Sequence, residues 1–348
     1  MKIGTVELEH PVALAPMAGM TDTAFRRLVK RMGGCGLVVT EMVSSEGLVR
    51  GIDRTLEYAE YTEEERPVSI QIFGGDPQVM AEAARVVEGM GADIVDVNMG
   101  CPVPKIAKHN AGCSLMREPA HAAEVVRAMV QAVRIPVTVK MRAGWNEHEI
   151  NAPELARMVE DAGASAVAVH GRTAAQSYTG ESDWSLIGRV AESLTIPVFG
   201  SGDCVEASHV VSRVGTSGVT GVLVGRGALR NPWIFRQAAE AADGGAPTAI
   251  SLEDRGRFLL AYVELLLDER AAEGAGFRHT APGQDAVAAP ARGRERWVIN
   301  KLRALGSWYT KGLEDGSHLR VAINSAESIP QLRRIVEDFF LKRDLLSV

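Results

Sequence analysis

Reactive and polar side chains recur in this sequence where short apolar runs end. Cys101 lies in the segment Asn98-Met-Gly-Cys-Pro, in which Gly100 and Pro102 fix a sharp loop that would expose the thiol. A thiol can act as a nucleophile, a metal ligand or a proton donor. No neighbouring histidine in the sequence would activate it, so covalent catalysis is not favoured over acid catalysis. Asn98 could hydrogen-bond a planar amide or imide ring, or it could form an Asx turn.

Lys140 and His170 end two further apolar runs. A lysine ammonium inside a pocket needs an anion or an electron-rich acceptor, because an unpaired buried charge is unfavourable. Two functional interpretations of Lys140 therefore stay open: a Schiff-base lysine, or a cation that stabilises negative charge on an electron-accepting cofactor. Its structural alternative is a lysine that reaches solvent from the strand end. His170 could contact a cofactor or be a satisfied structural histidine.

Two glycine-rich turns predict a phosphate site. They carry Ser201, Gly202 and Asp203 in the first turn, and Gly225 and Arg226 in the second. Glycine allows a close approach of the backbone to a ligand, and the N–H groups at a helix start bind phosphate. Arg226 would add a planar, charge-assisted contact. We therefore expect a ligand that carries phosphate, although glycines that only make tight turns are the structural alternative.

Eight short apolar runs would position these groups. Most lack polar alternation, as expected of parallel strands that are buried on both faces, and alanine-rich amphipathic segments separate them. The predicted strands are 12–15, 37–40, 68–72, 94–97, 137–140, 166–170, 198–200 and 221–224. Eight such units over about 240 residues match a closed (β/α)₈ barrel. An open doubly wound sheet is the alternative, but no G-x-G-x-x-G follows the first strand.

Polar side chains at the carboxyl ends of these strands would meet at one mouth of the barrel, where chemistry occurs in this architecture. Gln71, Arg142 and Arg172 join the residues above at such ends. A barrel selected only for stability needs few polar groups there. Their convergence is the strongest indication of function, and it does not depend on any single motif.

A second unit is predicted after the barrel, which we place at residues 1–243. Residues 244–348 contain a capping box at Ser251–Asp254 that opens a helix to residue 270, further helices from Trp297 and over 329–346, and a loop-like insertion at 271–295. Residues 291–348 carry 11 Lys and Arg against 7 Asp and Glu, whereas the whole chain carries 38 against 44. The basic end, with Arg296 and Arg303, and Lys105 near the mouth indicate an anionic partner. A solvated helix face would explain the arginines equally well.

Composition limits the other possibilities. The chain has 348 residues, is 46% hydrophobic and 24% charged, and contains four cysteines without a C-x-x-C pair. This composition is typical of a globular protein, and it gives no indication of a disulfide scaffold or a metal site. No apolar stretch spans a bilayer and no signal peptide is evident, so we expect a cytoplasmic protein without membrane association.

The motifs together resemble the tRNA-dihydrouridine synthases, and most closely the bacterial B subgroup. The resemblance is carried in order by Ala15-Pro-Met-Ala-Gly-Met-Thr-Asp, Gln71-Ile-Phe-Gly, Asp96-Val-Asn-Met-Gly-Cys-Pro, Lys140-Met-Arg, His170-Gly-Arg-Thr, Gly225-Arg-Gly-Ala-Leu and Asn231-Pro-Trp-Ile-Phe. It runs from residue 11 to about 235 and continues more weakly through Trp308-Tyr-Thr-Lys-Gly. The chain departs from the family pattern at Ser201, where asparagine is usual, at Arg230, and at Asn300, where a basic residue is common.

The resemblance implies a barrel that binds FMN and a helical domain that binds tRNA. NADPH or NADH would reduce the FMN, hydride would pass to C6 of an extruded uridine, and Cys101 would protonate C5. The implied cofactor residues are Pro16, Met17, Ala18, Gln71, Lys140, His170, Ser201, Gly202, Asp203, Gly225 and Arg226. The candidate substrate residues are Asn98, Lys105, Arg142, Arg172, Arg296 and Arg303.

Two alternatives remain at this point. A flavin barrel that acts on a free pyrimidine, as dihydroorotate dehydrogenases do, would share the phosphate loops and the lysine without needing the basic helical unit. A tRNA-binding module with an idle barrel would not need the cysteine loop. For the tRNA-dihydrouridine synthase we expect a monomer.

Overall fold

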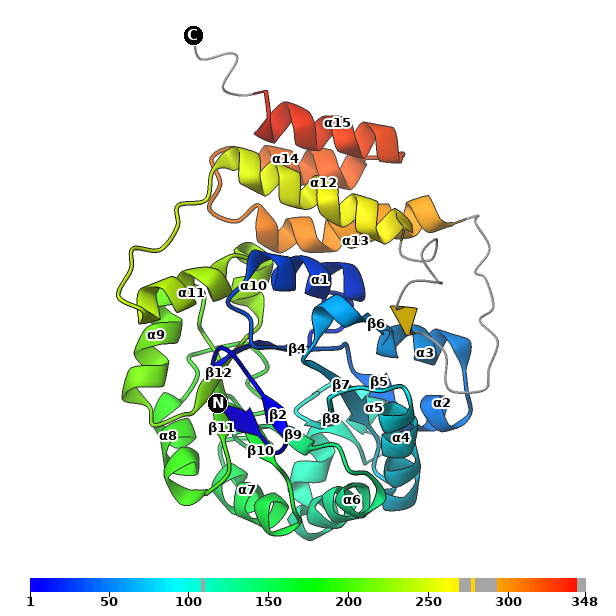
Figure 1. Ribbon diagram of the computed structural model, residues 1–348, viewed down its shortest axis with the longest axis vertical. Coiled ribbons are helices and arrows are strands. Elements are labelled where there is room, and N and C mark those ends of the chain that lie inside the picture. The colour runs from blue at the N-terminus through cyan, green and yellow to red at the C-terminus, as the bar shows by residue number, and fades with distance from the viewer. Residues whose placement is uncertain (108–109, 269–276, 279–292, 343–348) are drawn as a thin grey trace.

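The computed structural model describes residues 1–107, 110–268, 277–278 and 293–342. Eight parallel strands form a closed barrel, in which β4 pairs with both β3 and β7 to complete the ring (Figure 1). The barrel strands are β3 (Val12–Leu14), β4 (Leu37–Val39), β7 (Val68–Phe73), β8 (Ile94–Met99), β9 (Val137–Arg142), β10 (Ala166–His170), β11 (Val198–Ser201) and β12 (Gly221–Val224). The predicted (β/α)₈ barrel and its eight strands are confirmed, with ends that differ by at most two residues.

Helices surround the barrel on its outer face. They are α1 (Thr23–Met32), α2 (Ser45–Val49), α3 (Asp53–Ala59), α4 (Pro77–Gly89), α5 (Pro104–Ala107), α6 (Pro119–Ala132), α7 (Ala152–Asp161), α8 (Trp184–Ser193), α9 (Ala207–Thr216), α10 (Arg226–Arg230) and α11 (Ile234–Ala242), with 3₁₀ turns η1 (Glu63–Glu65) and η2 (Gly112–Arg117). Side-chain caps fix several helix starts. The Asp22 carboxylate accepts from the N–H of Phe25 at 2.9 Å, and Asp183 accepts from Leu186 at 2.9 Å.

A short N-terminal hairpin lies at the amino ends of the strands. It consists of β1 (Lys2–Ile3) and β2 (Val6–Glu7), and a side chain at Gly4 would collide with Pro136 and approach Ser165, which immediately precede β9 and β10. Ile3 and Leu8 are buried against an apolar cluster inside the barrel that includes Phe199. The apolar interior and this hairpin fill the amino end, so the open mouth lies at the carboxyl ends.

Four helices stack on one side of the barrel (Figure 1). They are α12 (Leu252–Asp268), α13 (Arg294–Tyr309), α14 (Gly316–Ser325) and α15 (Ile329–Phe340). The Ser251 and Asp254 side chains each accept from the other's backbone N–H at 3.0 Å, so the predicted capping box is confirmed. Val298, Leu302, Leu305 and Tyr309 of α13 are all buried, as their spacing predicts.

The predicted ends of this region differ from the structure in places. Helix α13 begins at Arg294, so the last two residues of the expected 271–295 loop are helical. Gly293 precedes this helix, and the described residues of the insertion also include β13 (Phe277–Arg278), which pairs antiparallel with β6 (Tyr61–Thr62). The helix expected over 329–346 ends at Phe340, so residues 341–342 are not helical. The expected helical residues 269–270 and 343–346 lie outside the described residues.

Aromatic side chains join the helical stack to the barrel. Phe25 of α1 meets Phe258 and Tyr262 of α12 edge to face, with ring centroids 6.1 and 6.2 Å apart. Phe258 in turn stacks on Tyr309 at 5.7 Å. These contacts make one continuous apolar core across the two units.

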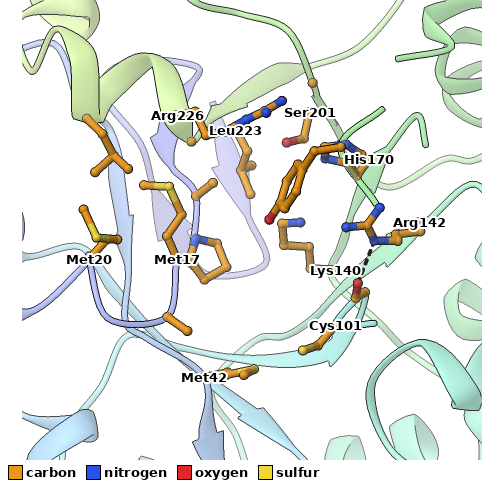
Figure 2. Close-up of a pocket in the computed structure, with 18 of the residues that line it drawn as sticks. Met17, Met20, Met42, Cys101, Lys140, Arg142, His170, Ser201, Leu223 and Arg226 are labelled. Atoms are coloured by element: carbon orange, nitrogen blue, oxygen red, sulfur yellow. Dashed lines mark hydrogen bonds between the residues drawn. The ribbon is translucent and has the colours of Figure 1, made fainter. Parts of the chain in front are cut away.

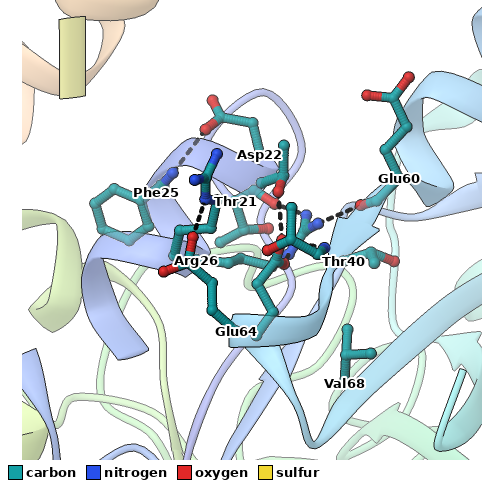
Figure 3. Close-up of polar contacts among 12 residues, drawn as sticks. Thr21, Asp22, Phe25, Arg26, Thr40, Glu60, Glu64 and Val68 are labelled. Atoms are coloured by element: carbon teal, nitrogen blue, oxygen red, sulfur yellow. Dashed lines mark hydrogen bonds and ion pairs between the residues drawn. The ribbon is translucent and has the colours of Figure 1, made fainter. Parts of the chain in front are cut away.

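A buried ion pair joins Arg26 of α1 to Glu65 of η1, and Figure 3 shows the polar contacts around Arg26. Arg26 and Glu65 are 1% and 0% exposed, and the Arg26 Nε lies 2.6 Å from the Glu65 carboxylate. Arg26 also donates to the carbonyls of Thr21 and Glu60, while Thr62 and Thr23 donate to Glu65. Because every charged atom has partners, the pair ties the chain after β3 to the segment before β7.

Candidate active site

A cavity of about 480 Å³ opens at the carboxyl ends of the barrel strands. Figure 2 shows its contents: Cys101 and Met42 lie on one side, Ser201 and Arg226 on the opposite side, and Lys140 between them. The predicted residues that line it are Pro16, Met17, Ala18, Gln71, Asn98, Cys101, Lys140, Arg142, His170, Ser201, Gly202, Asp203, Gly225 and Arg226. The structure therefore brings together all eleven proposed cofactor residues, the cysteine and two of the six proposed substrate residues.

Four predicted substrate residues lie elsewhere. Lys105 and Arg296 are exposed outside the cavity. Arg303 donates to the Ala326 carbonyl at 2.8 Å and to the Asn300 side chain at 3.2 Å, so it also organises the helical stack. Arg172 is buried and does not line the cavity itself, but its guanidinium contacts Asp203, which does. The strand-end position of Arg172 predicted the neighbourhood but not the direction of its side chain.

Asp203 holds the glycine-rich loops together. One Arg172 nitrogen contacts both Asp203 carboxylate oxygens, at 2.8 and 2.9 Å, and the Ser182 backbone N–H donates to the carboxylate at 2.8 Å. Arg226 lies 3.8 Å away. Burial opposes the charge of Asp203, but these donors outweigh it and lower the pKa of the carboxyl below its usual value. The acidic side chain of the first glycine-rich loop is thus already paired with arginine.

Gly202 is required both by its backbone conformation and by the lack of space for a side chain. Its φ is +132°, and an added Cβ would lie 2.1 Å from the Ser182 hydroxyl oxygen. No other residue fits without moving that neighbour. The loop brings backbone close to the cavity at the position where the sequence predicts phosphate.

The cysteine loop is fixed by Asn98. Its side-chain oxygen accepts from the backbone N–H of Gly100 at 3.1 Å and of Cys101 at 2.9 Å, which is the Asx turn that the sequence left open. The Asn98 nitrogen donates to Gln71 at 2.7 Å and still lines the cavity. The Asx-turn interpretation of Asn98 is therefore confirmed, and its contact with a planar ring stays a prediction.

Burial sets the protonation of the reactive groups. It raises the pKa of the Cys101 thiol above its ordinary value, so the thiol keeps its proton at neutral pH. Burial, together with Arg142, lowers the pKa of Lys140 to about 8, with Asp96 opposing the shift. Burial and the cations Lys140 and Arg142 lower the pKa of His170 to about 2. The histidine is therefore neutral, and its Nε2 is buried without a hydrogen-bond partner among the described residues.

Several lining residues were not predicted from the sequence. Met42 follows β4, the one strand whose carboxyl end was not considered among the strand ends. Tyr178 lies in the loop after β10, where its ring is 4.6 Å from the Arg226 guanidinium and 5.8 Å from that of Arg142. Trp308 reaches the cavity from α13. The position of Met42 and Tyr178 in loops after barrel strands could have indicated that they line the cavity. The place of Trp308 in the cavity depends on how the helical stack packs against the barrel.

Comparison with known proteins identifies close relatives. The family model described as dihydrouridine synthase (Dus) matches residues 13–285. The chain is 43% identical to a probable tRNA-dihydrouridine synthase of Rhodobacter capsulatus, over 77% of this chain and 83% of that one. It is 36% identical to tRNA-dihydrouridine synthase B of Xanthomonas campestris pv. campestris, over 98% of this chain and 96% of that one.

Solved structures share the architecture. Morphinone reductase aligns with a TM-score of 0.51 and 12% identity, covering 72% of this chain and 90% of that one. At this identity the likeness concerns the barrel fold alone. Within the described residues, no helix combines the length and apolarity needed to cross a membrane.

Proposed function

Because the chain belongs to the dihydrouridine synthase family, we propose that it is a flavin-dependent enzyme that reduces uridine in tRNA to 5,6-dihydrouridine. The observation that carries this proposal is the arrangement of the cavity. The cysteine loop lies on one side, the arginine-neutralised glycine loops lie on the other, and Lys140 stands between them (Figure 2).

The residues present fit FMN. The glycine loops with Arg226 suit a single phosphate, and the cavity volume lies within the range of about 300–1,000 Å³ that is usual for such ligands. The unpartnered Nε2 of the neutral His170 would hydrogen-bond the cofactor, and Pro16, Met17 and Ala18 would contact its ring. When bound and reduced by NADPH or NADH, FMN supplies a hydride to C6 of the uracil.

Cys101 supplies the proton in this proposal. Its raised pKa keeps the thiol protonated at neutral pH, which suits an acid better than a nucleophile. The Asx turn of Asn98 holds the cysteine backbone so that the thiol faces C5 of a base in the cavity. The Asn98 nitrogen also donates weakly to the Met42 sulfur at 3.9 Å, and a base carbonyl would replace that contact.

Lys140 acts as a cation rather than a Schiff-base nucleophile. With a pKa of about 8 it remains charged at neutral pH, and its position between the two sides of the cavity suits stabilisation of negative charge. The proposed reduction does not require the substrate to form an imine, so the Schiff-base interpretation is not needed.

Residues 244–348 would bind the tRNA. Trp308 lines the cavity from this helical unit, so RNA bound to it would lie beside the mouth, and a flipped uridine would reach the cysteine. Arg296 of α13 and Lys105 of α5 are exposed and are the candidate phosphate contacts. A tRNA substrate implies that the enzyme works in the cytoplasm.

The test is mass analysis of nucleosides from unmodified tRNA after incubation with the protein, FMN and NADPH. We expect one uridine to gain two hydrogens, and the gain to be lost or strongly slowed in Cys101→Ala. Free uracil and orotate serve as competing substrates. If NADPH is consumed while tRNA uridine stays unchanged and a free pyrimidine is reduced, the tRNA assignment is wrong and the barrel acts on a small molecule.

A further inference from the structure

A chain of hydrogen bonds leads from a buried carboxylate to the cysteine loop. Asp96 of β8 accepts from the Gln71 Nε2 at 2.7 Å, and the Gln71 Oε1 accepts from the Asn98 Nδ2 at 2.7 Å. The Asn98 Oδ1 then accepts from the Cys101 N–H at 2.9 Å. Three consecutive links therefore connect Asp96 to the backbone of Cys101.

The direction of the chain is fixed at the Cys101 end, because a backbone N–H can only donate. Burial raises the pKa of the Asp96 carboxyl, but both of its oxygens accept hydrogen bonds, from Gln71 and from Thr138. Each amide between them has one oxygen and one nitrogen, so only one orientation of Gln71 and of Asn98 satisfies every link. The other orientation would place a carbonyl oxygen against a carboxylate, or an NH₂ group against an N–H.

Asp96 itself does not line the cavity. It is 6% exposed, and its other oxygen accepts from the Thr138 hydroxyl at 2.6 Å. It therefore acts through the amides. A second effect is electrostatic, since its charge opposes the lowering of the pKa of Lys140.

We propose that Asp96 is a positioning residue that, through Gln71 and Asn98, sets the Cys101 loop and makes both amides present N–H donors to the ligands. This inference rests on the proposed function. A donor at Asn98 favours a base that offers a carbonyl oxygen, as uracil does, over one that offers an amino group at the same position. The role of Asp96 as a hydrogen-bond acceptor can be tested separately from its charge.

Two substitutions separate them. Asp96→Asn removes the charge but keeps an oxygen for Gln71, because its NH₂ can donate to the Thr138 hydroxyl. Asp96→Leu has a similar size and leaves Gln71 without an acceptor. We expect Asp96→Leu to release the cysteine loop and Asp96→Asn to leave it in place.

The readout is iodoacetamide alkylation of each cysteine in the whole protein, followed by mass spectrometry at pH 7. We expect alkylation of Cys101 to be at least threefold faster in Asp96→Leu, because a looser loop exposes the thiol, and unchanged in Asp96→Asn. Cys35, Cys113 and Cys204 are buried and report unfolding. With tRNA, kcat for uridine reduction should fall about tenfold in Asp96→Leu with KM unchanged.

Gln71→Met breaks the same chain one link later and covers the case in which Asp96→Leu unfolds. It should accelerate alkylation of Cys101 alone. Unchanged Cys101 reactivity in Gln71→Met, or equal acceleration in Asp96→Asn and Asp96→Leu, would overturn the inference. Alkylation requires no substrate, so its result does not depend on the tRNA assignment. If that assignment is wrong, the wild type will not reduce uridine, but the alkylation rates will still test the role of Asp96.

Discussion

The Lys301 ammonium of α13 lies 3.0 Å from the Asp22 carboxylate at the start of α1. It also donates to the Gly19 carbonyl at 3.0 Å and lies 3.4 Å from Glu41. Tyr262 of α12 donates to the same Asp22 oxygen at 2.7 Å. Burial opposes the charge of Lys301, but Asp22 and Glu41 outweigh it and raise the pKa of the ammonium. The helical unit thus holds the loop that carries Pro16, Met17 and Ala18.

Replacing Lys301 should therefore weaken cofactor binding at a distance. We expect Lys301→Met to raise the Kd for FMN about tenfold, because two buried carboxylates lose their shared cation and the loop loses its restraint. Lys301→Arg should restore much of the affinity. Fluorescence titration with FMN measures the effect, and Lys342→Met, which removes an exposed pair with Asp338, is the control. Equal FMN affinity in Lys301→Met and wild type would show that the barrel fixes the loop of Pro16, Met17 and Ala18 without help from the helical unit.

Uridine reduction should depend on the charge of Lys140. A group with a lowered pKa of about 8 is charged below that value and loses its proton as pH rises through it. We expect kcat to fall between pH 8 and 9.5, up to about tenfold per pH unit once the amine is neutral. The raised pKa of Cys101 keeps the thiol protonated over the first part of this range. Lys140→Met should be slow and independent of pH over that first part, and a flat wild-type profile there would exclude Lys140 as the titrating cation.

The Arg172–Asp203 contact gives a test of the phosphate loops. Arg172→Met leaves the Asp203 carboxylate beside the phosphate site without its main counter-ion. We expect the Kd for FMN to rise about tenfold, equivalent to about 1.4 kcal/mol, with a smaller change for riboflavin, which has no phosphate. Arg117→Met removes an exposed pair with Glu149 and should leave both affinities unchanged. An equal loss of affinity for riboflavin would show that the substitution acts on a part of the site other than the phosphate loops.

Breaking the buried Arg26–Glu65 pair should destabilise the fold. Either Arg26→Met or Glu65→Leu leaves one charge buried alone, which lowers the free energy of unfolding by about 3–5 kcal/mol. The double variant should lose less than either single variant. Urea denaturation measures this, with Arg50→Met as a control at an exposed pair for which a change below about 1 kcal/mol is expected. Additive losses in the double variant would contradict a direct interaction.

The strands and the membership of the cavity could be predicted because both follow local rules. Runs such as Val198–Gly200 are apolar on every residue when a strand is buried on both faces, and residues after parallel strands share one mouth. Local pattern does not say where a side chain turns. Arg172 and Arg142 both belong to strand-end motifs, yet only Arg142 lines the cavity, because Asp203 binds Arg172.

The helical contributions to the site could not be predicted for a different reason. Trp308 and Lys301 lie on a helix whose periodicity shows which residues are buried, but not which barrel loop they meet. That choice depends on aromatic contacts between α1 and α12 that connect positions more than 200 residues apart. Their consequence is that removing residues 244–348 would also expose Phe25 and release Asp22, so a truncated barrel is not a neutral comparison.

The Arg26–Glu65 pair also limits the sequence changes open to the protein's descendants. A lineage that replaces one partner first passes through a form with an uncompensated buried charge, and an apolar pair can be reached only after both changes. The two positions should therefore vary together among relatives or not vary at all. The neighbouring Arg27–Glu64 pair is partly exposed, so either residue can drift alone.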